Sequence, residues 1–397
     1  MLSNRTGADP NRKPLDGNVL VSMTEKITGF RPSFRHNRRP LSSFPAFAPA
    51  RYYFRTLMPR RPIFYLFLAA AALALAPALT RADMPAGTWT LLMENDRFAD
   101  TDRHYTHGTR VAWVSEEKDV GPEWVRRLLD HIPLIAKMNE SRIGFALGQN
   151  IYTPENISRS DLTVTDRPYA GWLYGAVSVH AEKHPKILGR TLDVLDTFEM
   201  QLGMIGPLSL AEPTQKTVHR LIDTTRPHGW SHQLDTELGI AMLAERKWRT
   251  PETKFGRGGI AFDIIPHLGA ALGNVYTHVN AGAMVRLGHN LAFDYGPPHI
   301  QPALSGLEAI DPSGAFGWYV FAGANGRAVG RNIFLDGNTF SDSHNVDKHV
   351  LVGDFQIGAA LVTGRWRIAY THVFRTREFE SQNEPDRFGA VSVSARF

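Results

Sequence analysis

The chain has 397 residues and no cysteine, so it is long enough for one large or two ordinary domains, and structural disulfides and thiolate metal sites are excluded. Its formal net charge of +5 comes from basic residues near the N-terminus, because acidic residues outnumber basic ones after Ala82. The sequence after Ala82 therefore lacks the basic surplus that nucleic-acid-binding proteins carry, and no nucleic-acid partner is expected.

The N-terminal residues predict a leader followed by an export signal. Residues 1–57 are rich in Arg, Pro and Ser and show no apolar periodicity, which indicates an untranslated or disordered leader before a start at Met58. Two arginines, the apolar run Ile63–Leu79 and the small residue Ala82 then follow. This order is typical of a signal peptide, here residues 58–82. A membrane anchor is the alternative, but a spanning helix needs roughly 20 apolar residues, more than this run contains.

The sequence after the signal predicts a β-barrel that crosses a membrane. Segments of about ten residues alternate between apolar and polar side chains and are separated by Gly, Pro, Asp and Asn, as transmembrane strands require. The last segment, Gly389–Phe397, alternates most regularly, and its terminal Phe397 is similar to the signal by which outer-membrane proteins engage the barrel assembly machinery. We therefore predict that residues 83–397 form an all-β, transmembrane antiparallel up-and-down barrel among the lipids of a Gram-negative outer membrane. A soluble exported β-sandwich is the alternative.

Twelve strands are predicted, an even number as in single-chain bacterial barrels. They are Trp89–Asn95, Thr106–Ser115, Arg142–Gln149, Tyr169–Glu182, Leu192–Gly203, Gln233–Lys247, Ile260–Ala270, Asn274–Arg286, Trp318–Arg327, His349–Val362, Arg365–Arg375 and Gly389–Phe397. The short link Thr363–Gly364 is expected on the periplasmic side, and the longer links Gly206–Ser231 and Leu287–Gly317 on the outer side. Apolar residues at helical spacing predict short helices within Glu116–Ser141 and Pro213–Ile222.

Polar residues that can do chemistry gather at predicted strand ends. The first group is Glu94–Asp96 with Asp102–Gly108, whose carboxylate, amide and hydroxyl oxygens are hard ligands that suit Ca²⁺ better than Zn²⁺. A solvated turn explains this group as well, because Asp and Asn favour turns. The second group runs from Gln149–Pro154 through Arg159 to Asp166–Trp172, where the charged residues either bind a ligand or fix a loop by hydrogen bonds.

The third group, Gln215–Arg220, lies in a predicted loop helix and contains His219. Histidine is the side chain most often used as a general base, which makes His219 a candidate for proton transfer. The sequence contains 16 histidines, and a single histidine is more often structural or solvated than catalytic.

Taken in order, these motifs resemble those of the lipid A 3′-O-deacylase family of outer-membrane barrels. The motifs are Glu-Asn-Asp, Asp-Arg-x-Tyr-Thr-x-Gly, Gln-Asn-Ile-Tyr-Thr-Pro, Asp-Arg-Pro-Tyr-Ala-Gly-Trp, Gly-Met-Ile-Gly-Pro and Gln-x-x-x-His-Arg. The resemblance covers nearly all of the chain after the signal. It implies a Ca²⁺-dependent esterase that removes the 3′-acyl or acyloxyacyl group of lipid A, the lipid of lipopolysaccharide. It also implies action from the outer leaflet, at a site between the barrel wall and a helical loop.

Matching the motifs residue by residue assigns roles. Asn95 and Asp96 correspond to the family's essential Asn-Asp pair, Thr106 to its hydroxyl at a strand start, and His219 to its catalytic histidine. In the implied mechanism, His219 deprotonates a water molecule while Ca²⁺ polarises the acyl carbonyl. The implied ligands of the ion are Asn95, Asp96 and Thr106. Asn95 and Thr106 hold either the ion or the oxyanion, and Asp96 either binds the ion or orients His219.

Substrate contacts are expected from Tyr105, Arg159, Arg167 and Gln215, with the arginines meeting a head-group phosphate. Arg159 stands where the family can have a lysine, and Thr225 where it can have an acidic residue. The enzymatic alternative is an outer-membrane phospholipase with a serine nucleophile, but its His-x-Ser-Asn-Gly type of motif does not occur in the sequence. The non-enzymatic alternative is a structural barrel or pore.

Overall fold

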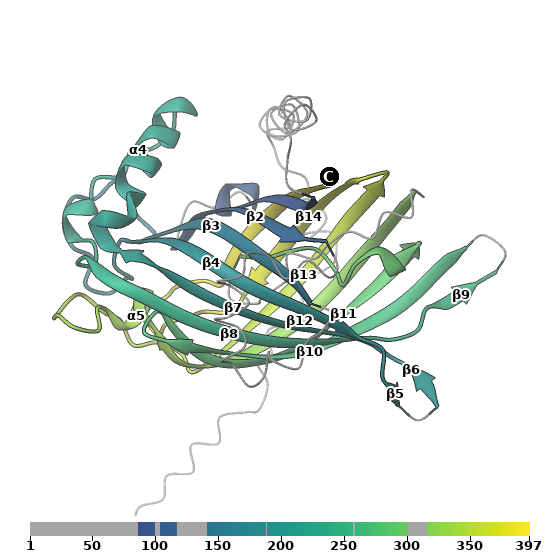
Figure 1. Cartoon of the computed structure of the whole chain (residues 1–397). Coiled ribbons are helices and arrows are strands. Elements are labelled where there is room, and N and C mark those ends of the chain that lie inside the picture. The colour runs from purple at the N-terminus through teal and green to yellow at the C-terminus, as the bar shows by residue number, and fades with distance from the viewer. Residues whose placement is uncertain (1–85, 100–103, 117–140, 188, 257–258, 301–315) are drawn as a thin grey trace, which may run out of the picture. The chain divides into compact units, whose positions relative to one another are not determined.

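Among the residues that the structure describes, twelve long strands close into an antiparallel barrel (Figure 1). The computed structural model describes residues 86–99, 104–116, 141–187, 189–256, 259–300 and 316–397. These residues all belong to one unit, Phe54–Phe397. The leader and the signal peptide predicted before residue 83 lie outside the described residues, as does the helix predicted between Glu116 and Ser141.

The strands pair in chain order, so the predicted up-and-down topology is confirmed. The last strand pairs with the first and closes the sheet. The twelve strands are β1 (Gly87–Asn95), β2 (His104–Ser115), β3 (Ser141–Thr153), β4 (Ala170–Lys183), β7 (Asp193–Ile205), β8 (Glu237–Arg249), β10 (Ile260–Gly273), β11 (Tyr276–His289), β12 (Gly317–Asn332), β13 (Leu351–Thr363), β14 (Trp366–Arg375) and β15 (Asp386–Arg396). Each of them overlaps one predicted strand.

Shorter elements connect or extend these strands. They are the strands β5 (Lys186–Ile187), β6 (Arg190–Thr191) and β9 (Thr253–Phe255), the helices α4 (Ala211–Leu221) and α5 (Ile333–Asp336), and the 3-10 turns η1 (Asp96–Ala99), η2 (Gly206–Ser209), η3 (Trp230–His232) and η4 (Leu291–Phe293). No helix in the described part of the chain is long and apolar enough to cross a membrane.

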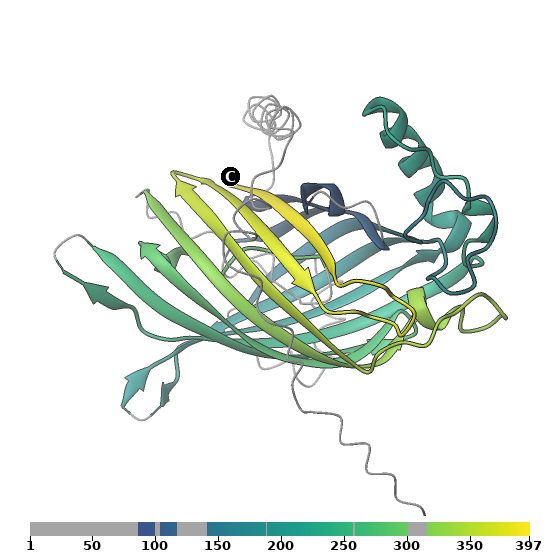
Figure 2. The same ribbon diagram turned by 180° about the vertical axis from the view of Figure 1, so that it is seen from behind.

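The two ends of the barrel differ. Gly87 and Phe397 exchange main-chain hydrogen bonds of 3.1 and 2.9 Å at one end, which we call the terminal end. The helices α4 and α5 lie at the opposite end, which we call the loop end (Figure 2). The turn Thr363–Gly364 lies at the terminal end, and the link Gly206–Ser231 with α4 lies at the loop end. These two links therefore lie at opposite ends of the barrel, as the sequence predicts.

The barrel is apolar outside and polar inside. Leu147 and Val279 on the outer surface are 61% and 58% exposed, whereas Ser394 of the last strand is fully buried in the interior. Inside, Ser394 Oγ accepts hydrogen bonds from Thr90 Oγ1 (2.8 Å) and Arg367 Nη2 (3.2 Å). This distribution is the reverse of that in a soluble protein and is typical of an outer-membrane barrel.

The link between β11 and β12 occupies part of the interior. Its Asp294 carboxylate accepts hydrogen bonds from Arg286 Nη1 (2.6 Å), Arg367 Nη1 (2.9 Å) and the Tyr319 hydroxyl (2.9 Å). Further hydrogen bonds join the same link to β1 and β4. Contacts to strands around the barrel wall hold this segment inside, which disfavours an open pore.

The position of this link corrects one prediction. We expected Leu287–Gly317 to form a loop on the outer side, but β11 and β12 are joined at the terminal end, and residues 291–300 turn into the barrel. The length of the link suggested the outer side. Consecutive strands run in opposite directions, so the place of a strand in the chain order decides at which end of the barrel its link lies. The interior arginines then attract the acidic side chain of the link.

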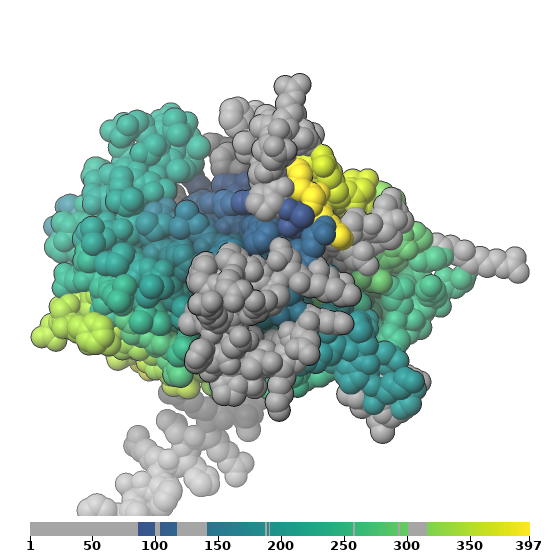
Figure 3. All heavy atoms as spheres, in the orientation of Figure 1, coloured from purple at the N-terminus to yellow at the C-terminus, as the bar shows by residue number. Residues whose placement is uncertain are grey.

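The helix α4 projects from the loop end of the barrel (Figure 3) and contacts the wall at β3 and β4. Ile151 packs with Ala211 and Trp230 in a buried cluster under the helix. Ile151 lies on the same face of β3 as the exposed Leu147, so this cluster is outside the barrel. A Cβ on Gly171 would lie 2.3 Å from the Cβ of Ala211, so glycine is required for this close packing.

Candidate active site

The turn between β1 and β2 holds Asn95 in one orientation. Asn95 Nδ2 donates to the main-chain carbonyl of Thr106 (2.7 Å) and lies 3.4 Å from His107 Nδ1. On the other side, Asn95 Oδ1 accepts a hydrogen bond from the Arg97 N–H (2.9 Å). Because donor and acceptor atoms of the amide are both engaged, a rotated amide would lose these contacts. Asp96 follows at the start of η1 and is only 1% exposed.

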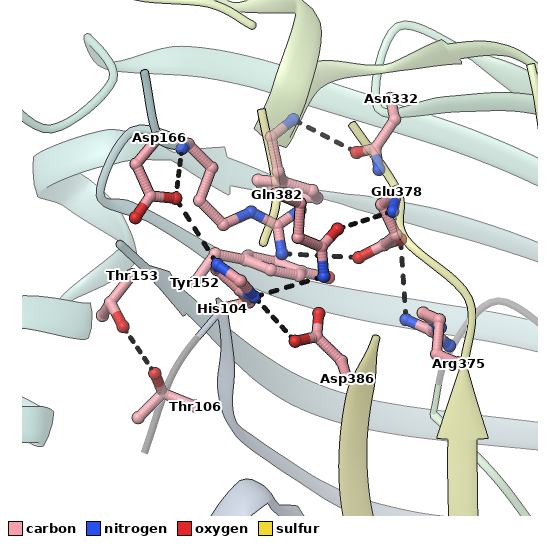
Figure 4. Close-up of polar contacts among 12 residues, drawn as sticks. His104, Thr106, Tyr152, Thr153, Asp166, Asn332, Arg375, Glu378, Gln382 and Asp386 are labelled. Carbon is pink, nitrogen blue, oxygen red and sulfur yellow. Dashed lines mark hydrogen bonds and ion pairs between the residues drawn. The ribbon is translucent and has the colours of Figure 1, made fainter. Parts of the chain in front are cut away.

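A β-bulge in β2 positions Thr106. The pairing of β2 with β3 shifts register between Tyr105 and His107, which makes Thr106 the extra residue. Its hydroxyl shares a hydrogen bond of 2.8 Å with the Thr153 hydroxyl (Figure 4). Bulges re-aim side chains next to functional sites, and regular alternation does not predict them.

The helix α4 presents two predicted site residues to the barrel wall. Ala211, Gln215 and His219 recur every four residues, so they share one helix face, and this face is buried. Gln215 Oε1 accepts a hydrogen bond from Trp230 Nε1 (2.8 Å), whereas Gln215 Nε2 has no hydrogen-bond partner among the described residues. A buried amide donor of this kind favours a ligand contact.

The His219 ring has a defined tautomer. His219 Nδ1 lies 2.6 Å from the main-chain carbonyl oxygen of Thr225. Because a carbonyl only accepts, Nδ1 carries the proton, and in the neutral ring Nε2 keeps a lone pair. The orientation of His219 therefore depends on the main chain at Thr225 and not on the side chain at that position.

The loop after α4 brings His219 to the β1–β2 turn. Arg97 Nη2 donates to the Thr224 hydroxyl (2.6 Å), which ties this loop to η1. The imidazoles of His107 and His219 are close enough to interact electrostatically. The structure thus places the predicted residues of the turn and His219 in one region on the outer wall.

His107 is a member of this region that the sequence did not single out. Its Nε2 lies 2.6 Å from the Thr109 hydroxyl, and its Nδ1 faces the Asn95 amide. The one feature of the sequence that pointed to His107 was its position directly after Thr106, the hydroxyl residue predicted for the site. Because the chain contains 16 histidines, this position did not distinguish His107 from the others.

A pocket of about 650 Å³ lies beside this region at the loop end. Its lining comes from His104, Thr225, the β3–β4 link at residues 155–166 and the β14–β15 link at residues 379–383. Thr225 connects the pocket with the region around His219, because its carbonyl orients His219 and the residue also lines the pocket. Arg159, predicted to meet a phosphate, is exposed in this lining.

Buried charged groups form the floor of the pocket (Figure 4). His104 Nδ1 lies 2.6 Å from Asp386 Oδ1, and His104 Nε2 lies 3.5 Å from Asp166 Oδ1. Burial by itself would raise the pKa of Asp166. Hydrogen bonds from His104 and from the main-chain N–H groups of Glu155 and Arg167 nevertheless hold this pKa below its ordinary value. Asp166 is therefore a stable anion that fixes the strand end and the link around it.

Tyr105 and Arg167 lie in the packed interior instead. The Tyr105 ring is 5.4 Å from that of Tyr152 and 5.2 Å from that of Phe388. Arg167 is 1% exposed, stacks over the Tyr152 ring and lies 3.5 Å from Glu378. The structure packs Tyr105 among aromatic rings and gives Arg167 both a ring contact and an ion pair, whereas the sequence led us to expect direct substrate contact from both residues. The reason is that these side chains point into the barrel, away from the wall that carries His219.

Asn95, Asp96 and Thr106 supply an amide, a carboxylate and a hydroxyl oxygen within one turn and bulge. Ca²⁺ takes about six to eight oxygen ligands of these kinds, some of them from water. In the part of the chain that the structure describes, no three His, Asp or Glu side chains converge to hold a metal. The donor set fits Ca²⁺ in its chemistry, with Asp96 as the single carboxylate among the three.

Comparisons with known proteins relate this architecture to one family. The chain matches the family described as Outer membrane protein LpxR over residues 66–397. The structure of LpxR from Salmonella typhimurium is similar, with a TM-score of 0.63, 19% sequence identity and coverage of 78% of this chain and 100% of that chain. The β-domain of the Bordetella autotransporter BrkA aligns with a TM-score of 0.37, 8% identity and coverage of 79% of this chain and 100% of that chain. No curated protein sequence matches the chain.

The family match spans most of the chain, and the barrel has the fold of the Salmonella protein. The apolar outer surface and the closed sheet agree with residence in the outer membrane. The chain belongs to the LpxR family of outer membrane proteins.

Proposed function

We propose that the protein is an outer-membrane esterase that removes the ester-linked 3′-acyl or acyloxyacyl group from lipid A. The observation that carries this proposal is the His219 imidazole. Its Nδ1 bonds to the Thr225 carbonyl, its Nε2 keeps a lone pair, and the ring is close enough to His107 of β2 to interact with it electrostatically. The site lies on the outer wall of the barrel, the surface that meets the acyl chains of the membrane. Membership in the LpxR family supports the same substrate.

In the proposed reaction, His219 Nε2 takes a proton from a water molecule while the water oxygen attacks the acyl carbonyl carbon. The Thr225 carbonyl stabilises the imidazolium, because it accepts a hydrogen bond from Nδ1. The ester C–O bond then breaks, and His219 returns the proton to the leaving sugar oxygen. The products are a free carboxylic acid and a sugar hydroxyl, and no covalent acyl-enzyme forms.

A bound Ca²⁺ would polarise the acyl carbonyl and stabilise the negative charge on its oxygen. The residues proposed to hold it are Asn95, Asp96 and Thr106. The contacts of the Asn95 amide with Arg97 and His107 keep this turn in one conformation, so the oxygens are in place before substrate arrives.

Acyl release is expected to fall by about 100-fold in excess chelator, because the oxyanion then loses its principal electrostatic partner. Adding Ca²⁺ back should restore it. The measurement is fatty acid release from purified lipid A by the protein in detergent micelles. Turnover that is unchanged after chelation would remove the ion from the mechanism while leaving the role of His219 intact.

Two further residues are proposed to bind the lipid head group and ester. The exposed Arg159 guanidinium meets a phosphate, and the Gln215 Nε2 donor meets a substrate oxygen. Tyr105 and Arg167 act indirectly, by keeping the interior behind the site packed.

The direct test is mass spectrometry of lipid A from cells that do and do not produce the protein. We expect lipid A to lose the mass of its 3′-acyl or acyloxyacyl group only in the producing cells. Incubation of the purified protein with phospholipid vesicles separates this activity from that of a phospholipase. Unchanged lipid A together with fatty acid release from phospholipid would overturn the proposal.

The variant Thr225→Ala is expected to retain lipid A deacylation within about threefold of wild type. The hydrogen bond that orients His219 comes from the main chain, which the substitution leaves in place, and the Thr225 side chain itself is exposed. The rate of acyl release under saturating lipid A checks this. A loss of 100-fold or more would show that the side chain takes part in the site.

A further inference from the structure

The pocket at the loop end has a rim of one chemical kind. Amide and hydroxyl side chains line it, namely Asn156, Ser158, Thr163, Thr165, Ser381 and Asn383. Amides and hydroxyls both donate and accept hydrogen bonds, as the hydroxyl groups of a sugar do. A rim of this composition therefore complements a ligand that is rich in hydroxyl groups.

The charges of the lining do not favour an anion as the main ligand. Arg159 is the single Lys or Arg among the described lining residues, and the carboxylates of Glu155 and Asp166 belong to the same lining. Phosphate sites gather positive charge from arginine, lysine or helix N-termini. One phosphate can meet Arg159 at the rim, while the remaining wall is left for uncharged polar groups.

The floor is held rigidly before any ligand binds. Gln382 Oε1 accepts a hydrogen bond from the Glu378 N–H (2.6 Å), and Gln382 Nε2 donates to the Glu384 carbonyl (2.9 Å). Phe379 is 1% exposed, and its ring contacts the edge of His104 at 5.4 Å. A preformed site lowers the entropy cost of binding. The volume of about 650 Å³ lies in the range of about 300–1,000 Å³ that small-molecule sites occupy.

We propose that this pocket binds a saccharide that extends from the lipid A head group and so holds the ester next to His219. The proposal rests on the proposed function, because the pocket adjoins the site through Thr225. That residue lines the pocket, and its carbonyl orients His219. A sugar bound here is covalently joined to the acylated disaccharide, so its binding energy positions the reacting ester.

The first test compares the KM of the enzyme for lipid A with that for lipopolysaccharide carrying a short oligosaccharide. We expect the KM for the lipopolysaccharide to be about tenfold lower in the wild type. The variant Asn383→Trp fills the pocket and should abolish that difference. The control Asn345→Trp alters an exposed asparagine of the α5–β13 link and should keep it. Each of these asparagines makes a single long hydrogen bond through Nδ2, at 3.3 Å and 3.2 Å respectively.

The second test does not depend on catalysis. The free oligosaccharide, released from lipopolysaccharide by mild acid, is titrated calorimetrically into wild-type protein and both variants. Binding by the wild type and Asn345→Trp but not by Asn383→Trp supports the pocket, even if no lipid A is turned over and the proposed function fails. Equal KM values for both substrates in the wild type, or the absence of oligosaccharide binding, would overturn the proposal.

Discussion

The variant His219→Ala is expected to lose lipid A deacylation by a factor of about 10²–10⁴ while the barrel remains folded. The reason is that His219 supplies the proposed general base, and its ring lies on α4 outside the strand ladder that closes the barrel. Mass spectrometry of lipid A gives the activity, and the shift in gel migration between boiled and unboiled protein reports the folded barrel.

A second substitution separates proton transfer from positioning. In His219→Gln, the amide N–H can still reach the Thr225 carbonyl, but the side chain has no titratable nitrogen. We expect this variant to be as inactive as His219→Ala. His232→Ala is the control, because His232 is an exposed histidine in the same α4–β8 link. Normal acyl release by His219→Gln would rule out the base role.

The variant Asp294→Ala is expected to lower the free energy of unfolding by about 3–5 kcal/mol. Asp294 is fully buried and pairs with both Arg286 and Arg367, so its removal leaves two guanidinium groups without their shared anion inside the barrel. The Tyr319 hydroxyl also loses its acceptor. Equilibrium urea unfolding in lipid vesicles measures the change.

The control for this prediction is Glu212→Ala, which removes an exposed ion pair with Lys216 on α4. Such a pair contributes about 0.5 kcal/mol or less, so its loss should barely change the unfolding midpoint. Asp294→Asn keeps the shape but removes the charge, and an intermediate loss is expected. If Asp294→Ala and Glu212→Ala are equally stable, the interior link does not depend on its ion pairs.

The strands could be predicted from the sequence because a membrane barrel imposes one strict pattern on every strand. Residues such as Val279 must be apolar to face lipid, while Ser394 faces a polar interior. This period of two recurs in every one of the twelve strands, interrupted only locally by bulges such as that at Thr106, so each strand could be identified. The link Leu287–Gly317 was misplaced, because the pattern describes which face a residue occupies and not which end of the barrel a link reaches.

The candidate site was only partly predictable. Asn95, Thr106 and His219 stand out in sequence motifs, whereas the hydrogen bond between η1 and the loop after α4 joins residues 127 positions apart in the chain. His107 enters the site through its electrostatic interaction with His219 and through a bulge that breaks the alternation. Tyr105 was expected at the substrate, but the side of the wall that it faces depends on the same bulge.

The sequence by itself determined the twelve-stranded barrel and the helix that carries His219, since each leaves a local pattern of residue types, and the family resemblance singled out Asn95, Asp96 and His219. Only the tertiary structure decided what orients His219. A carbonyl at Thr225 holds its ring, and a main-chain group leaves no trace in the residue type. The same is true of the interior link at Asp294, whose partners come from strands far apart in the chain and meet only when the barrel closes.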